Sequence, residues 1–180
     1  MTLFLSLNSF GQNHAHHNEA SEKSAKPSAV VIFMAVDCPV TQKYMSTIKS
    51  LALYYQNHIS FTGYFPAGLT RQGEKQFRKE YNIPDIIKLV DDKSHQMTVK
   101  LNASITPEVF LLTVTGEVLY SGAIDNWFFE LGRYRPEITE NYLIDAITAT
   151  LNQTAPIVTK TTAIGCFIQN KKQDKGHHQH

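Results

Sequence analysis

The apolar run Ala29–Val36, AVVIFMAV, constrains the fold more than any other feature of the sequence. It is short, continuous and rich in β-branched residues, a pattern typical of a strand that is buried on both faces of a sheet. Asp37, Cys38 and Pro39 follow directly, and the next segment, Val40–His58, has the apolar spacing of an amphipathic helix. A buried strand that leads straight into a helix predicts an α/β domain with a cysteine at the junction.

The rest of the sequence continues this alternation. We predict strands at Ile59–Phe65 and Ile86–Asp92, helices at Leu69–Ile83 and Ser94–Asn102, a hairpin over Pro107–Gly122 that turns at Thr115-Gly116, and a last helix over Thr139–Asn152. The expected N-caps are Ser94 and Thr139. The expected buried helix positions are Tyr44, Ile48, Leu51, Tyr55, Leu143, Ile147 and Leu151. This order predicts a three-layer α/β sandwich around a mixed central sheet.

Composition and charge limit the domain organisation and the partners. The chain has 180 residues, 42% of them hydrophobic, which is enough for one domain with tails. We expect the domain at residues 29–152, a polar leader at 1–28 and an extension at 153–180. A net charge of +1 gives no basic surface for nucleic acid. No run of about eighteen apolar residues is present, so no membrane span is expected.

The N-terminal sequence MTLFLSLNSFGQ predicts export. It has the apolar and small residues of the later part of a secretory signal peptide, although the basic start is missing. We therefore expect a truncated signal and a mature protein in the periplasm, where disulfides persist. A polar tail that happens to begin with Leu and Phe is the alternative.

The order of these features resembles the thioredoxin fold, and within it the redoxins, a group of peroxiredoxin-like and thiol-disulfide proteins. The likeness rests on "DCP" at the first strand-to-helix junction, on "LVDD", and on "ITPEVFLLTVTGEVLYSGAID" with Thr106-Pro107 just before the hairpin. The closing "TKTTAIGCFI" resembles the Gly-Cys segment of a group of exported bacterial redoxin domains. In the thioredoxin fold a cis proline faces the cysteine, and the neighbouring backbone pairs with the substrate chain; Pro107 and Thr106 match these positions.

Two departures from the family patterns narrow the activity that the resemblance implies. A thioredoxin dithiol motif has a second cysteine three residues after the first, where this chain has Thr41. A peroxiredoxin carries Thr or Ser three residues before its cysteine and Pro four residues before that, where this chain has Ala35 and Val31. A peroxide substrate is therefore less expected than a protein disulfide.

Cys38 is the candidate nucleophile. Its place at a helix N-terminus favours the thiolate, because the helix dipole and the unpaired N–H groups stabilise a negative charge. Asp37 is expected to act in the opposite direction and raise the pKa of the thiol. Pro39, next to the cysteine, and Trp127 are candidate substrate contacts. Trp127 lies in the aromatic segment Ile124–Thr139, an expected loop that can cover the cysteine or receive a partner, although aromatic residues this dense are more often packed core.

Cys166 is the candidate partner, because the chain has two cysteines and no disulfide-rich pattern. The pair can be read as a redox couple with Cys166 as the resolving cysteine. It can also be read as a permanent bridge, which would stabilise the fold by about 4–5 kcal/mol in the chain-entropy model. Two unpaired thiols, or a metal site, are the third interpretation.

Three functions follow from these alternatives. The first is a thiol-disulfide oxidoreductase that needs no cofactor and acts on a protein thiol or disulfide partner. The second is a copper-binding protein that uses Cys38, Cys166 and the histidines of the two tails. The third is a redox-silent interaction module of the same fold.

The oligomeric state is not indicated by the sequence, and His58 and His95 receive no role. The tail histidines are His14, His16, His17, His177, His178 and His180.

Overall fold

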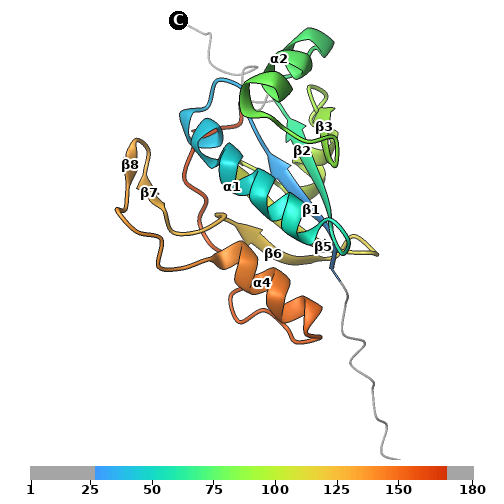
Figure 1. Cartoon of the computed structure of the whole chain (residues 1–180), viewed down its shortest axis with the longest axis vertical. Coiled ribbons are helices and arrows are strands. Elements are labelled where there is room, and N and C mark those ends of the chain that lie inside the picture. The colour runs from blue at the N-terminus through green and yellow to red at the C-terminus, as the bar shows by residue number, and fades with distance from the viewer. Residues whose placement is uncertain (1–26, 170–180) are drawn as a thin grey trace, which may run out of the picture.

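The computed structural model describes residues 27–169 of the chain (Figure 1). The predicted signal segment, most of the polar leader and the six tail histidines lie outside these residues. No helix within residues 27–169 is long and apolar enough to cross a membrane.

A five-stranded mixed sheet forms the centre of the domain, with the strand order β3-β2-β1-β5-β6. The first three strands are parallel, and β5 and β6 are antiparallel to the neighbours that they pair with. The predicted hairpin is therefore confirmed. The strands are β1 (Pro27–Phe33), β2 (Ser60–Phe65), β3 (Ile87–Asp91), β5 (Glu108–Thr113) and β6 (Val118–Gly122).

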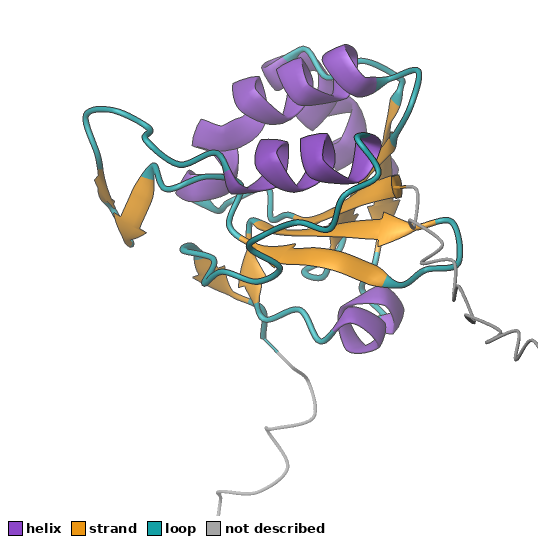
Figure 2. Ribbon diagram, turned by 90° about the horizontal axis from the view of Figure 1, so that it is seen from below, coloured by secondary structure: helices purple, strands orange, loops and turns teal. Residues whose placement is uncertain are grey.

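Helices cover both faces of this sheet, as Figure 2 shows. The side chains of β1 alternate between two hydrophobic clusters, with Val30 and Ile32 on one face and Val31 and Phe33 on the other. The first face packs against α1 (Pro39–Tyr55), α2 (Arg71–Tyr81) and α4 (Tyr142–Leu151), and the second against α3 (Gln96–Leu101). Helices on both sides of a mixed sheet give the three-layer sandwich that the sequence predicts.

The helix faces agree with the predicted spacing at all positions but one. Tyr44, Ile48, Leu51 and Tyr55 of α1 are buried, and so are Leu143 and Ile147 of α4. Leu151, the last residue of α4, is 37% exposed.

Both predicted N-caps are wrong. His95 is the N-cap of α3, and the buried carboxylate of Asp92 accepts hydrogen bonds from the N–H groups of Met97 and Thr98. Asp92, which follows β3, thus provides the hydrogen-bond acceptor for the first turn of α3 that Ser94 was expected to provide. The N-cap of α4 is Asn141, whereas the Thr139 hydroxyl accepts a hydrogen bond from the Asn126 side chain.

The aromatic segment between β6 and α4 is not a simple loop. It forms a small hairpin of β7 (Phe128–Glu130) and β8 (Arg133–Tyr134), which projects from the body of the domain in Figure 1. Gly132 turns the hairpin with φ +79°, a value that an L side chain rarely adopts. Part of the hairpin is packed and part is exposed.

The chain after α4 runs back along the domain. We call residues 159–169 the C-terminal strap. Its first part lies against β6, where Ser121 N–H donates to Thr159 O and Thr161 N–H donates to Ser121 O, both at 3.0 Å. Its last part forms β9 (Cys166–Phe167), which pairs antiparallel with β4 (Ile105–Thr106).

Candidate functional site

Cys38 is the N-cap residue of α1, where β1 has ended and the helix begins. Its side chain is 1% exposed. In the protonated form the thiol donates a hydrogen bond to the backbone carbonyl of Thr106, with a sulfur–oxygen distance of 3.0 Å. A turn of chain around Cys38 is held by the Gln42 side chain, which donates to Val36 O at 2.9 Å. The sulfur is therefore held inside the protein, against β4.

Thr106 joins the two cysteines. The Thr106-Pro107 peptide bond is cis. Thr106 faces Cys166 in the β4–β9 ladder, and its hydroxyl donates to Cys166 O at 3.3 Å. Gly165 makes this approach possible, because a Cβ there would lie 2.1 Å from Thr106 O. The strap thus carries Cys166 to the carbonyl that already binds Cys38, and the two thiols come within hydrogen-bonding reach.

The two thiols differ in acidity. Burial raises the pKa of Cys38, but hydrogen bonds from the Cys166 thiol and from Thr41 outweigh it, so the pKa lies below its usual value. For Cys166, burial, the hydrogen bond to Cys38 and the negative charges of Cys38 and Asp37 raise the pKa to about 12. Cys38 is therefore the more acidic thiol of the reduced pair.

Asp37 contributes to the raised pKa of Cys166, because its negative charge opposes ionisation of that thiol. The sequence predicted that Asp37 would raise the pKa of the neighbouring Cys38. The pKa of Cys38 is nevertheless lowered, since the hydrogen bonds to its sulfur outweigh burial.

Thr41 takes the place that the second cysteine of a dithiol motif would have, one helical turn after Cys38. It is fully buried, and its hydroxyl is a buried side-chain oxygen without a hydrogen-bond partner among the described residues. Its hydroxyl and its backbone N–H both lower the pKa of Cys38. The hydroxyl gains an acceptor when Cys38 ionises, because the sulfur then no longer donates to Thr106 O.

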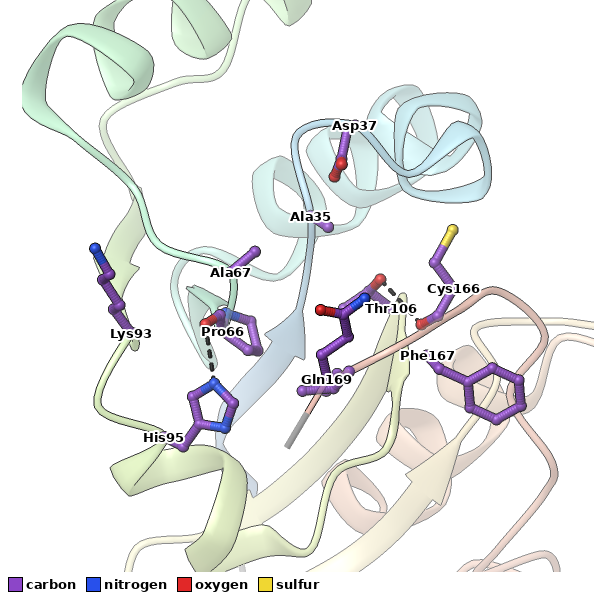
Figure 3. A pocket seen from close by; sticks show the side chains of 11 residues that line it. Ala35, Asp37, Pro66, Ala67, Lys93, His95, Thr106, Cys166, Phe167 and Gln169 are labelled. Carbon is purple, nitrogen blue, oxygen red and sulfur yellow. Dashed lines mark hydrogen bonds between the residues drawn. The ribbon is translucent and has the colours of Figure 1, made fainter. Parts of the chain in front are cut away.

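A cleft of about 470 Å³ opens beside Cys166 (Figure 3). The strap forms one wall, and the strand ends of β1, β2 and β3 form the other. His95 lies in this cleft, and its ring nitrogen is 3.1 Å from Pro66 O. The lining residues are Ala35, Asp37, Pro66, Ala67, Lys93, His95, Thr106, Cys166, Phe167, Ile168 and Gln169.

Solved structures support the architecture. An uncharacterised conserved protein from Geobacillus kaustophilus superposes with a TM-score of 0.68 at 18% identity, over 82% of this chain and 78% of its own. A hypothetical protein from Sinorhizobium meliloti 1021 gives 0.66 at 20% identity, over 81% and 80%. A thioredoxin-like protein in the oxidised form gives 0.52 at 15% identity, over 72% and 80%. The chain has a thioredoxin-like fold. Its sequence matches no protein-family model and no curated protein.

Within this thioredoxin-like fold, the predicted site residues divide into two groups. Cys38, Cys166 and Thr106 are brought together, and Pro107 follows Thr106 directly. Pro107 also borders a much smaller pocket with Tyr44 and Asp125. Trp127 lies elsewhere: its ring packs edge-on against Tyr44 at 5.5 Å, in the β7–β8 region, and it does not line the cleft. Pro39 begins α1 and does not line the cleft either.

The sequence patterns did not indicate three polar residues that line the cleft. Lys93 and His95 come from the segment between β3 and α3, and Gln169 from the end of the strap. No motif in the sequence connects these segments, because only the sheet topology brings them together. Among residues 27–169 no three His, Cys, Asp or Glu side chains converge as metal ligands.

Proposed function

We propose that this protein is a thiol-disulfide oxidoreductase whose redox centre is the pair Cys38 and Cys166. The observation that carries the proposal is the ladder position of Cys166 opposite Thr106, which brings a distant thiol next to Cys38. Oxidation of the pair forms one S–S bond and releases two electrons and two protons. A disulfide of a partner protein takes up both and becomes two thiols, and the same exchange in reverse lets a partner dithiol reduce the pair and close its own disulfide.

The difference in acidity supports this chemistry. A thiolate is the nucleophile in disulfide exchange. The lowered pKa of Cys38 favours the thiolate at that sulfur, and the raised pKa of Cys166 favours the thiol form beside it. Such a pair is what a dithiol needs for a resolving step, in which one thiol attacks a mixed disulfide that the other has formed.

A disulfide substrate fits the site better than a peroxide. Ala35 and Val31 take the positions at which a peroxiredoxin has a hydroxyl residue and a proline, and both are apolar residues of the buried layer. Export to the periplasm is part of the proposal, since an oxidising compartment suits a cysteine pair. The residues that suggest export lie outside those that the structure describes.

A thiol count with peptide mapping tests the proposal. Native protein is alkylated before and after treatment with reductant, and any Cys38–Cys166 bridge is located by mass spectrometry. Its reduction potential is then measured in glutathione buffers. We expect a bridge with a potential above about −300 mV, the value below which structural disulfides typically lie.

Other outcomes separate the alternatives. A bridge that resists reduction identifies a structural disulfide. Two thiols that stay free in air contradict the proposal and direct attention to metal binding. Equal reduction of a protein disulfide by the wild type and by Cys38→Ser identifies a redox-silent module.

A further inference from the structure

The two sulfurs of the pair differ in access as well as in acidity. Cys38 is 1% exposed, whereas Cys166 is partly exposed and lines the cleft. Cys38 is absent from the lining of the cleft. Figure 3 shows Cys166 at the wall of the cleft, with its sulfur turned toward the N-terminal end of α1. A molecule in the cleft therefore contacts one cysteine of the pair and not the other.

The strap also closes the other approach to Cys38. The β4 backbone, at which an extended partner chain would pair, is already paired with β9. Further hydrogen bonds hold the strap there, from Ile168 N–H to Ser104 O at 2.9 Å and from the Thr106 hydroxyl to Cys166 O. Gly165 packs directly against the Thr106 carbonyl. While the strap is seated, no partner strand reaches Cys38 along β4.

We propose that Cys166, not Cys38, is the cysteine that exchanges with the partner, through the cleft. This inference rests on the proposed function. In the oxidised protein an incoming thiolate attacks Cys166 Sγ and forms a mixed disulfide there. The Cys38–Cys166 bond breaks, and Cys38 leaves with the electron pair as a thiolate. A second thiol of the partner then attacks the partner sulfur, closes the partner's disulfide and releases Cys166, which takes up a proton.

The chemistry of the leaving group agrees with this direction. A thiol of lower pKa leaves faster in disulfide exchange. The hydroxyl and the backbone N–H of Thr41 lower the pKa of Cys38 independently of Cys166, so they stabilise Cys38 as the leaving thiolate. Attack at Cys38 would have to expel Cys166, which lacks this support, and would have to reach a sulfur that the protein covers.

The position of an early adduct tests the proposal on the wild-type protein. The oxidised protein is mixed with glutathione, or with a short peptide that contains one cysteine, and quenched in acid at short times. Peptide mapping then locates the adduct.

We expect at least about tenfold more adduct on Cys166 than on Cys38 with either thiol, and no such preference in denaturant, where access is equal. More adduct on Cys38 overturns the inference and leaves the proposed function intact. If no Cys38–Cys166 disulfide forms at all, the proposed function itself fails.

A cleft-filling substitution provides a second, independent test. Ala67 is exposed and lines the cleft beside Pro66. Ala67→Trp is expected to slow reduction of the disulfide by glutathione several-fold and to leave the equilibrium potential unchanged, because it alters access and not the pair. Val114→Trp, at a side chain that is 77% exposed in the β5–β6 turn, is the matched control. An unchanged rate in Ala67→Trp contradicts entry through the cleft.

Discussion

Thr41 lies one helical turn after Cys38, the N-cap of α1, and its hydroxyl lowers the pKa of the Cys38 thiol. Both residues are buried, and the hydroxyl has no hydrogen-bond partner among the described residues. A buried hydroxyl without a partner is a cost to the folded state. When Cys38 ionises, its sulfur can accept a hydrogen bond from this hydroxyl. The unpaired hydroxyl therefore destabilises the protein with a protonated Cys38 and favours the thiolate.

Thr41→Val is predicted to raise the pKa of Cys38 toward its usual value. The substitution keeps a similar shape and removes the donor that favours the thiolate. The pKa is measured from the ultraviolet absorbance of the thiolate in the reduced protein, where Cys166 ionises only near its pKa of about 12. At a pH where Cys38 is protonated, the free energy of unfolding is expected to stay the same or rise by up to about 1 kcal/mol.

Thr41→Ser is the control for this prediction, because it retains the hydroxyl. A pKa of Cys38 that shifts equally in both variants would show that packing, and not the hydroxyl, sets the acidity.

Gly165→Ala is predicted to unseat the strap. A Cβ at this position would lie 2.1 Å from Thr106 O and 2.7 Å from Thr106 C, both backbone atoms that cannot move aside. Cys166 would then lose its place next to Cys38. We expect slower formation of the Cys38–Cys166 disulfide and faster alkylation of Cys38, because the covering strand is displaced.

The control for Gly165→Ala is Gly116→Ala in the β5–β6 turn. Gly116 has φ +85° and open space around it, so alanine there costs about 1 kcal/mol in backbone strain without touching the strap. Equal effects of the two variants on disulfide formation would mean that general destabilisation explains the result.

Thr161→Val is predicted to lower the free energy of unfolding by about 1 kcal/mol, since it removes the acceptor of the partly buried Ala123 N–H, while the Tyr120 hydroxyl still donates to Ala123 O. The Thr161 hydroxyl accepts from Ala123 N–H at 2.9 Å and lies 2.6 Å from the hydroxyl of the fully buried Tyr120. Urea unfolding of the reduced protein measures the loss. Thr154→Val removes an exposed hydroxyl that water can replace, and should be nearly neutral. Equal losses in both variants would contradict an anchoring role for Thr161.

The sequence was sufficient for the elements of the sheet and for the position of Cys38, because these depend on local apolar patterns. The turn at Thr115-Gly116 and the burial of Ile48 and Ile147 follow from the same patterns. The caps were not predictable in this way. Asp92 caps α3 through a side chain that returns from the end of β3, a geometry that the short-range pattern at Ser94 does not contain.

The sequence predicted the two cysteines of the site but not how they are brought together. Cys166 could be named as a partner, but its position depends on the path of the strap along β6 and on the close approach of Gly165 to Thr106. An aromatic residue in a predicted loop suggests a substrate contact at Trp127, but the ring of Trp127 packs on Tyr44. The proposed roles of the two cysteines therefore come from burial and access, which no spacing in the sequence shows.

Asp125→Asn is predicted to flatten the pH dependence of stability. The Asp125 carboxylate is 3% exposed, and it accepts hydrogen bonds from the Tyr44 hydroxyl and from Trp127 N–H. Burial outweighs these bonds and raises the pKa of Asp125. Between the unfolded-state pKa of about 4 and this higher value, the folded protein keeps a proton that the unfolded chain releases. Stability is therefore present at low pH and is lost as the pH rises through this window, by up to about 1.4 kcal/mol per pH unit.

The asparagine variant removes this loss, since its side chain can still accept from Tyr44 and Trp127 and carries no charge. Urea unfolding of the reduced protein at a series of pH values from 4 to neutral measures the difference, in pH steps of about 1. Asp85→Asn, at a fully exposed side chain, controls for the loss of a surface charge. A pH profile of Asp125→Asn that parallels the wild type would mean that other groups cause the dependence. A profile that becomes flat would show that the fold tolerates a buried carboxyl group beside Tyr44 only at a measurable cost in stability at neutral pH.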